Sequence, residues 1–190
     1  MGNEIDLLAK YPRTKRDLAQ RLESKTEEVR LVARKFDKDF FDGERKFGYG
    51  GFSYNPRYWS EVVKDFSNYY NLNDESKILD VGCAKGFMLY DFYKLNPQLD
   101  LHGVDVSKYA IDNSVSEIKN KLQVANATKL PYEDNFFDLV ISVVSLIPLL
   151  TFSYSSSISF LITFISLSFK FNNEEKKTLE NNGSTLCSII

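Results

Sequence analysis

Two acidic residues close apolar runs of the chain, and a turn of small residues lies between them. Asp80 is followed by a valine and by Gly-Cys-Ala-Lys-Gly at 82–86, and Asp105 closes the apolar run 101–105. A strand, a glycine turn, a helix and then a carboxylate at the tip of the next strand form a frame that can hold an adenosine-containing ligand. We therefore expect a nucleoside site at one edge of a parallel sheet.

The residues of the turn narrow the class of ligand. A dinucleotide site needs G-x-G-x-x-G, and the three slots here hold Gly82, Ala84 and Phe87. Phenylalanine in the third slot prevents the close helix packing that NAD and FAD sites use. No phosphate-binding G-x-x-x-x-G-K-[ST] occurs in the sequence. The remaining candidate is a ligand with an ammonium and a carboxylate but no phosphate, such as the amino-acid end of S-adenosylmethionine.

Hydrophobic periodicity predicts the elements that position these residues. We expect strands at 77–82, 101–106, 122–126 and 136–144, with helices at 86–95 and 108–119, the second capped by Ser107. Strands that alternate with helices predict a parallel sheet with both faces covered. Upstream, residues 13–40 read as helical, with Thr14 and Ser24 as possible caps. A glycine and aromatic loop at 47–54 and a short helix containing Tyr58, Trp59, Val62, Val63 and Phe66 follow.

Composition bounds the function. A chain of 190 residues with 43% apolar residues can bury one core, so we expect one domain. A net charge of -2 gives no electrostatic reason to expect nucleic acid or an anionic membrane as partner. The two cysteines, Cys83 and Cys187, form no C-x-x-C pair, so neither a zinc site nor a disulfide framework is indicated. The first residues lack a basic stretch followed by an apolar core, which favours a cytoplasmic location.

The composition changes after residue 138. No charged residue occurs from 139 to 169, and the apolar stretch 147–169 is about as long as a bilayer is thick. A transmembrane helix there is weakened by Pro148 and by many Ser and Thr residues, and two buried strands are a second interpretation. The third is a tail from a truncated or shifted reading frame, which we favour because its polar end shows no amphipathic period. We also expect residues 158–171 to supply a strand beside 136–144, whose edge is otherwise unpaired.

Four motifs in order carry a family resemblance. Asp80-x-Gly-x-Ala-x-Gly, Asp105, Asn126-Ala-Thr-Lys-Leu-Pro-Tyr and Asp134-Asn-Phe-Phe-Asp-Leu-Val-Ile-Ser resemble the class I S-adenosylmethionine-dependent methyltransferases. The resemblance covers roughly 76–145. It implies an α/β, Rossmann-like parallel sheet of strand order 3-2-1-4-5-7-6 with flanking helices, S-adenosyl-L-methionine as cofactor, and methyl transfer to a small-molecule acceptor.

Because the resemblance ends near residue 146, it implies a sheet that is incomplete in its C-terminal half, with impaired activity as one consequence. We therefore divide the chain into a helical N-terminal extension at 1–75, a partial S-adenosylmethionine-binding core at 76–146 and an atypical tail at 147–190. Two other functions stay open. One is a cofactor-binding or interaction remnant without turnover, and the other is a methyltransferase-like domain tethered to a membrane through 147–169.

The family also implies roles for individual residues. Asp80 would orient the methionine ammonium, Asp105 would accept hydrogen bonds from both ribose hydroxyls, and Asn126 would meet the adenine edge. The full cofactor-binding set is Asp80, Gly82, Cys83, Ala84, Gly86, Asp105, Val106, Asn126 and Ala127. Two positions depart from the family: Ala84 replaces the commoner middle glycine, and Asn126 offers an amide donor where an acid is common.

A plainer interpretation stands beside each role. The two acids could cap neighbouring helices, and Cys83 fits a small buried residue better than a nucleophile. His102, the single histidine, has no partner at a telling spacing. The aromatic loop could be a lid over the cofactor or simple packing.

Overall fold

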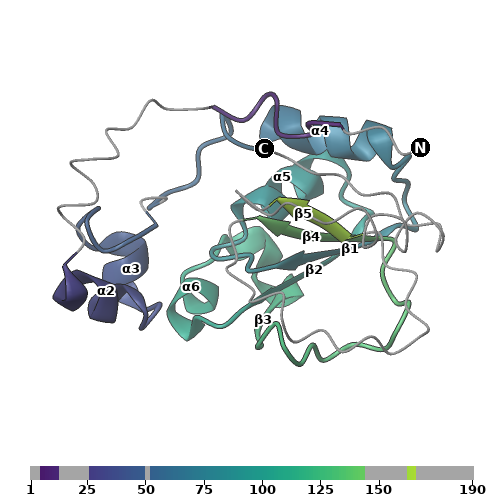
Figure 1. Ribbon diagram of the computed structural model, residues 1–190. Coiled ribbons are helices and arrows are strands. Elements are labelled where there is room, and N and C mark those ends of the chain that lie inside the picture. The colour runs from purple at the N-terminus through teal and green to yellow at the C-terminus, as the bar shows by residue number, and fades with distance from the viewer. Residues whose placement is uncertain (1–4, 13–25, 50–51, 144–161, 166–190) are drawn as a thin grey trace, which may run out of the picture.

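A computed structural model describes residues 5–12, 26–49, 52–143 and 162–165 of the chain. Its centre is a five-stranded sheet of order β3-β2-β1-β4-β5, with every pair parallel (Figure 1). The strands are β1 (Lys77–Val81), β2 (Asp100–Asp105), β3 (Leu122–Val124), β4 (Leu139–Val143) and β5 (Ile162–Ile165). The helices are α2 (Glu27–Ala33), α3 (Lys38–Asp42), α4 (Ser60–Tyr69), α5 (Phe87–Leu95), α6 (Lys108–Asp112) and the 3-10 helix η1 (Ser116–Lys121). The predicted Rossmann-like α/β class and the order of the first five strands are confirmed.

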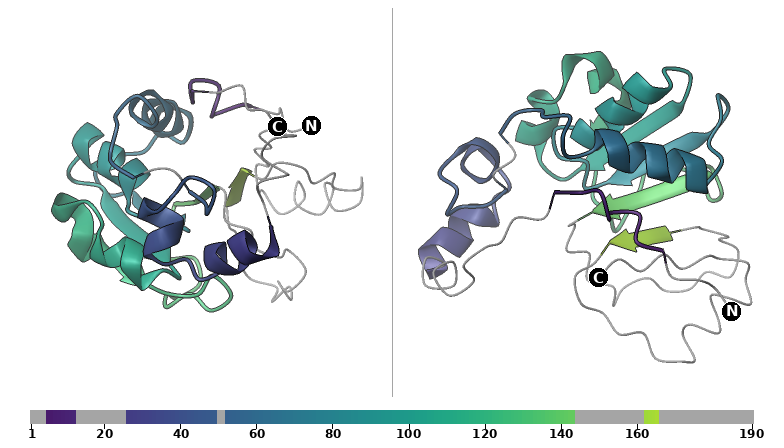
Figure 2. Two further views of the ribbon diagram at one scale, coloured as in Figure 1. Left: turned by 90° about the vertical axis from the view of Figure 1, so that its left-hand side faces the viewer. Right: turned by 90° about the horizontal axis from the view of Figure 1, so that it is seen from above.

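One face of the sheet packs against helices. Helices α4 and α5 lie on the same side of the strands (Figure 2). The core on this side contains Phe66 of α4, Leu89 and Phe92 of α5, Ile118 of η1, and Ile78, Leu101, Leu139 and Ile141 of the strands. Removing this much apolar surface from water is the main stabilising term of the fold.

The opposite face has a different cover. Leu79, Val81, Val104 and Val140 pack against partly buried side chains of the loop between β3 and β4, namely Ala125, Ala127, Leu130, Tyr132 and Phe137. Within the described ranges, a loop rather than a helix covers these strands, so the expectation of a helical layer on each face is corrected.

The predicted helix 108–119 is two shorter elements. Helix α6 ends at Asp112, and η1 begins at Ser116. The Asn113 side-chain amide donates to the carbonyl of Tyr109 at 2.8 Å, and the Ser114 hydroxyl donates to that of Ile111 at 2.8 Å. Such side chains compete with the helical hydrogen bonds, which explains the break.

Two predicted strands are also shorter than expected. Strand 122–126 ends at Val124, because Asn126 opens a turn in which its own carbonyl accepts from Lys129 N at 2.9 Å. Strand 136–144 begins at Leu139, because a turn with Asn135 at φ 60° precedes it.

The N-terminal helical prediction is partly corrected. Of residues 13–40, the structure describes 26 onward, and there α2 and α3 are separated by Phe36 at φ 49°. The N-cap of α2 is Thr26 rather than Ser24, since the Thr26 hydroxyl accepts from Val29 N at 3.3 Å. The predicted cap at Thr14 lies outside the described residues. The predicted short helix is α4, which begins after Trp59.

The expected extra strand is present. Strand β5 lies beside β4 in parallel, with Ile141 opposite Thr163, which confirms that part of 158–171 pairs with this edge. Across the described residues, no helix has both the length and the apolar character needed to span a bilayer. Most of the segment 147–169 lies outside them.

Candidate functional site

The two predicted acids share one face of the sheet at the carboxyl ends of neighbouring strands. Asp80 of β1 pairs with Gly103 of β2, and Asp105 follows two residues later on the same strand. Side chains alternate between faces, so the three positions lie on the same side, where α5 packs. The carboxyl edge is where open α/β sheets bind ligands.

Asp80 is a buried acid with little to stabilise its charge. Only 5% of its surface is exposed. Burial, together with the negative charge of Asp105, raises the pKa of Asp80 to about 7. Among the described residues, no hydrogen bond to its carboxylate offsets this shift. A cationic group bound at this edge would supply the missing partner.

The Asp105 carboxylate is held by backbone N–H groups. Its Oδ2 accepts from Ala84 N at 2.8 Å, and its Oδ1 accepts from Ser107 N at 2.8 Å. Burial raises the pKa of Asp105, and these hydrogen bonds oppose the rise. Each carboxylate oxygen has a second lone pair, so a ligand diol can still be bound. The ligand role and the plainer capping role are therefore compatible at this residue.

The glycine turn is tied to both neighbouring elements. Gly82 N and Cys83 N both donate to the carbonyl of Val104, at 2.8 and 3.0 Å. Gly82, Ala84 and Gly86 all have positive φ. At Gly86 a Cβ would lie 2.7 Å from Ile118 Cδ1 and 2.8 Å from Leu122 Cδ1, so only glycine fits there.

Ala84 departs from the glycine of the family for a visible reason. Its methyl group packs in a small cluster with Phe41 of α3 and Ala110 of α6. This contact offsets part of the cost of a left-handed conformation at φ 51°.

The turn leads into a helix end without a side-chain cap. Gly86 is the N-cap of α5, and the first N–H that bonds back within the helix is that of Tyr90, to Gly86 O at 2.8 Å. The amides of the first turn and the positive end of the helix therefore remain available to an anion.

Cys83 points into the core rather than toward a ligand. It is 5% exposed, and burial raises the pKa of its thiol well above the usual value. The interpretation of Cys83 as a small buried residue is confirmed, and only its main chain can reach a ligand. A Cβ added to Gly103 would lie 2.9 Å from Cys83 Sγ, 2.8 Å from Leu89 Cδ1 and 2.4 Å from Leu122 Cδ2.

Two other predicted residues, Val106 and Asn126, are exposed, and a third, Ala127, is partly buried. Val106, next to Asp105, is 55% exposed, which is unusual for an apolar residue at a strand end. Asn126 is exposed, and its Oδ1 accepts from Thr128 N at 3.0 Å and Thr128 Oγ1 at 2.9 Å, which leaves its amide N–H groups as the donors. Ala127 packs on the opposite face of the sheet.

His102 is not part of this site. It alternates with Gly103 and faces the other side of the sheet, where the rings of Tyr132, Phe136 and Phe137 surround it. Its Nε2 lies 2.9 Å from Asp100 Oδ1, so the expectation that it lacks a partner is wrong. The aromatic contacts of His102 hold the loop between β3 and β4 against β2.

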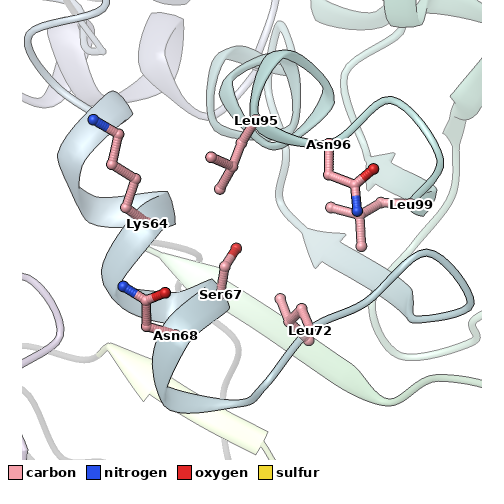
Figure 3. A pocket seen from close by; sticks show the side chains of 7 residues that line it. All are labelled: Lys64, Ser67, Asn68, Leu72, Leu95, Asn96 and Leu99. Carbon is pink, nitrogen blue, oxygen red and sulfur yellow. The ribbon is translucent and has the colours of Figure 1, made fainter.

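A hollow of about 300 Å³ lies elsewhere, between α4 and the end of α5 (Figure 3). It is lined by Lys64, Ser67, Asn68, Leu72, Leu95, Asn96 and Leu99. Asn96 and Leu99 lead into the start of β2, so the hollow is at the opposite end of the sheet from Asp105. Its one charged lining residue, Lys64, is paired with Glu61 at 2.6 Å.

Three residues near the site, Lys85, Asp42 and Tyr49, were not predicted as site residues from the sequence. Lys85 of the turn is paired with Asp42 of α3 at 2.6 Å, and Tyr49 follows that helix. Burial of its hydroxyl, and then the charges of Tyr11, Asp80 and Asp105, raise the pKa of Tyr49. The residue as a whole is 42% exposed. The aromatic loop was the only signal for these contacts.

The sequence of this chain matches a known protein family over the part that contains the site. A family model described as "Methyltransferase domain" matches residues 72–181, more than half of the chain. The chain belongs to this methyltransferase domain family. The match continues past residue 146, where the sequence motifs lose their resemblance.

Curated relatives of this methyltransferase domain are longer proteins. Phosphoethanolamine N-methyltransferase 3 of Arabidopsis thaliana is 34% identical over 105 residues, which are 52% of this chain and 20% of the relative. Phosphoethanolamine N-methyltransferase of Triticum aestivum is 33% identical over 106 residues, with the same coverage. The chain thus spans about a fifth of the length of these relatives.

The chain is also similar to solved methyltransferase structures over part of its length. Phospholethanolamine N-methyltransferase 2 of Haemonchus contortus, in complex with phosphomonomethylethanolamine and S-adenosylhomocysteine, has 17% identity and a TM-score of 0.45 over 74% of this chain and 36% of that chain. An S-adenosylmethionine-dependent methyltransferase of Clostridium acetobutylicum has 20% identity and a TM-score of 0.36 over 45% and 35%. The family assignment rests on the family model.

Proposed function

We propose that this chain binds S-adenosyl-L-methionine at the carboxyl ends of β1 and β2 and transfers its methyl group to a small-molecule acceptor. The observation that supports this most is Asp80, a buried carboxylate without a cationic partner among the described residues, on the same face as Asp105. A buried acid in this state costs stability unless a ligand pairs with it.

The residues present fit the parts of this cofactor. Asp80 would pair with the methionine ammonium, and the uncapped start of α5 would face the methionine carboxylate. Asp105 would accept from the ribose hydroxyls, with the exposed side chain of Val106 against the adenine face. The proposed contact set is Asp80, Gly82, Cys83, Ala84, Gly86, Asp105, Val106, Asn126 and Ala127, with main-chain contacts alone at Cys83.

The protein has a limited chemical task in such a reaction. When bound, S-adenosyl-L-methionine supplies a methyl group that its sulfonium has already activated. The chain then has to hold the acceptor in line with that group, and alignment alone can supply a large part of the rate enhancement. A base is needed only where the acceptor must lose a proton.

A small amine is the acceptor that we propose first. Two relatives at 33–34% identity are named as phosphoethanolamine N-methyltransferases. A net charge of -2 does not favour nucleic acid as the acceptor, and the location that we propose is cytoplasmic.

Calorimetric titration with S-adenosylhomocysteine tests the cofactor site. We expect saturable binding to the wild-type chain and a loss of about tenfold or more in Asp105→Asn, because the amide has one acceptor oxygen where the carboxylate has two. His102→Gln, on the opposite face, is the matched control and should bind like the wild type. Equal affinities in all three chains would refute the assignment of Asp105.

A labelled-methyl assay with phosphoethanolamine and its methylated forms then tests turnover. A second function is cofactor binding without turnover. Binding of S-adenosylhomocysteine with no labelled product from any of these acceptors would support that second function over the first.

A further inference from the structure

Lys85, in the middle of the glycine turn, is a buried cation with a complete set of partners. Its Nζ donates to Asp42 Oδ1 at 2.6 Å, to Asp42 Oδ2 at 2.7 Å and to the carbonyl of Phe52 at 3.0 Å. These three acceptors match the three N–H groups of an ammonium. The residue is only 5% exposed, and a buried ammonium is tolerated only where it is paired in this way.

Both partners of Lys85 belong to the segment that precedes the sheet. Asp42 is the last residue of α3, and Phe52 lies in the aromatic loop that follows. Figure 1 shows α3 near α6, away from α4. The ion pair therefore ties α3 to the turn of the candidate cofactor site across a separation of 43 residues in the chain.

Further contacts join the same segment to the start of α6. The Tyr109 hydroxyl donates to Asp42 Oδ2 at 2.7 Å, and the Ser107 hydroxyl donates to the carbonyl of Phe36. Phe41 is 2% exposed and packs in one cluster with Ala84. The segment 36–42 is thus fixed against the turn, with the Lys85 pair as its charged contact.

The loop that follows α3 carries two exposed aromatic residues, Tyr49 and Phe52. Tyr49 N donates to the Phe40 carbonyl at 3.0 Å, and its ring lies 5.5 Å from that of Phe41. Tyr49 and Phe52 are 42% and 43% exposed. Their positions therefore depend on α3 and on the Lys85 contact.

Downstream, the loop is held by a second and separate contact. The Tyr54 hydroxyl donates to Asp91 Oδ1 at 2.6 Å, and the Ser60 hydroxyl donates to the same oxygen at 3.0 Å. Asp91 belongs to α5 and not to the turn. This contact offers a matched control, because it can be broken without touching Lys85.

The geometry points to Lys85 as a positioning residue for methyl transfer, which holds α3 and the aromatic residues Tyr49 and Phe52 over the cofactor turn so that they line the approach of the acceptor. The inference rests on the proposed function. It assigns Lys85 no contact with the cofactor or with the reacting atoms.

Three chains are compared with the wild type: Lys85→Met, Lys85→Arg and Tyr54→Phe. In Lys85→Met, we expect the Tyr49 amide to exchange about tenfold faster and the acceptor KM to rise about tenfold, because misplacement of about 1 Å is costly for catalysis. Affinity for S-adenosylhomocysteine should stay within about threefold, since the ligand contacts remain. Lys85→Arg should recover part of both losses, and Tyr54→Phe should leave Tyr49 exchange unchanged.

Unchanged Tyr49 exchange and acceptor KM in Lys85→Met would overturn the inference, and so would equal effects in Tyr54→Phe. If Lys85→Met does not fold, Asp42→Asn replaces it, because the amide keeps one acceptor for the ammonium; it should shift both readouts in the same direction by a smaller factor. If the wild-type chain binds no S-adenosylhomocysteine, the proposed function fails, while the exchange comparison still confirms or overturns the role of Lys85.

Discussion

The raised pKa of Asp80 predicts that the free energy of unfolding depends on pH, and the surroundings of Asp80 decide the sign of that dependence. Burial, and then the charge of Asp105, raises the pKa of Asp80 from 3.8 to about 7. At pH values between these two pKa values, Asp80 therefore holds a proton in the folded chain that it has released in the unfolded chain. The stability contributed by this group is complete below about pH 4 and is lost as the pH rises through about 7.

The magnitude follows from the size of the shift. About three pKa units correspond to about 4 kcal/mol, which is an upper limit for the loss of stability between about pH 4 and pH 8. Asp80→Asn removes the titration while keeping the shape. We expect its gain in unfolding free energy over the wild type to grow from near zero at about pH 4 to as much as about 4 kcal/mol at about pH 8, measured by urea unfolding.

Ligand binding should depend on pH in the opposite sense. An ammonium next to Asp80 favours the carboxylate, so binding releases the proton. With a pKa of about 7, the ionised fraction rises from about 3% at pH 5.5 to about 75% at pH 7.5, which predicts an affinity for S-adenosylhomocysteine about 25-fold higher at the upper pH. Calorimetry in two buffers of different ionisation enthalpy would detect the released proton directly.

Substitutions on the two faces of the sheet separate the effect of Asp80 from that of a residue outside the site. His102 is the single histidine of the chain and lies on the opposite face, so His102→Gln should keep the pH dependence of affinity. Asp80→Asn should remove it. An affinity that is flat from pH 5.5 to 7.5 in the wild type, together with identical unfolding profiles for the wild type and Asp80→Asn, would refute the reasoning.

Two further substitutions test the turn itself. Gly86→Ala should lower the free energy of unfolding by about 2–3 kcal/mol, because a methyl group at φ 78° is strained and would lie 2.7 Å from Ile118 Cδ1; urea unfolding measures it. Ala84→Gly should stay within about 1 kcal/mol of the wild type, since relief of the left-handed conformation offsets the lost contact with Phe41. A large loss of unfolding free energy in Ala84→Gly, or none in Gly86→Ala, would contradict this account of the turn.

The elements that the sequence predicted well are those fixed by local pattern. The apolar run before Asp80 fits only a buried strand, and β1 begins and ends within one residue of the prediction. The helix over 108–119 failed because apolar spacing continues through Asn113 and Ser114, whose side chains bind the backbone.

The site was predicted to a similar extent. Asp80 and Asp105 could be paired from sequence because parallel strands place their carboxyl ends at one edge. The contact of Lys85 with Asp42 could not, since the partners are 43 residues apart in the chain and Lys85 occupies a position that the glycine-turn motif leaves unspecified. The exposed left-handed break at Phe36, which allows α3 to turn toward α6, also leaves no signal in residue type.

Gly103 constrains how this sequence can vary over evolution. Atoms of Leu122, Leu89 and Cys83 would each lie within 3 Å of a methyl group at that position, and they come from a strand, a helix and the turn. A larger residue at 103 would have to arise together with smaller ones at the other three positions. We therefore expect these four positions to covary among homologues. Their joint packing fixes the distance between β1 and β2, and with it the distance between Asp80 and Asp105.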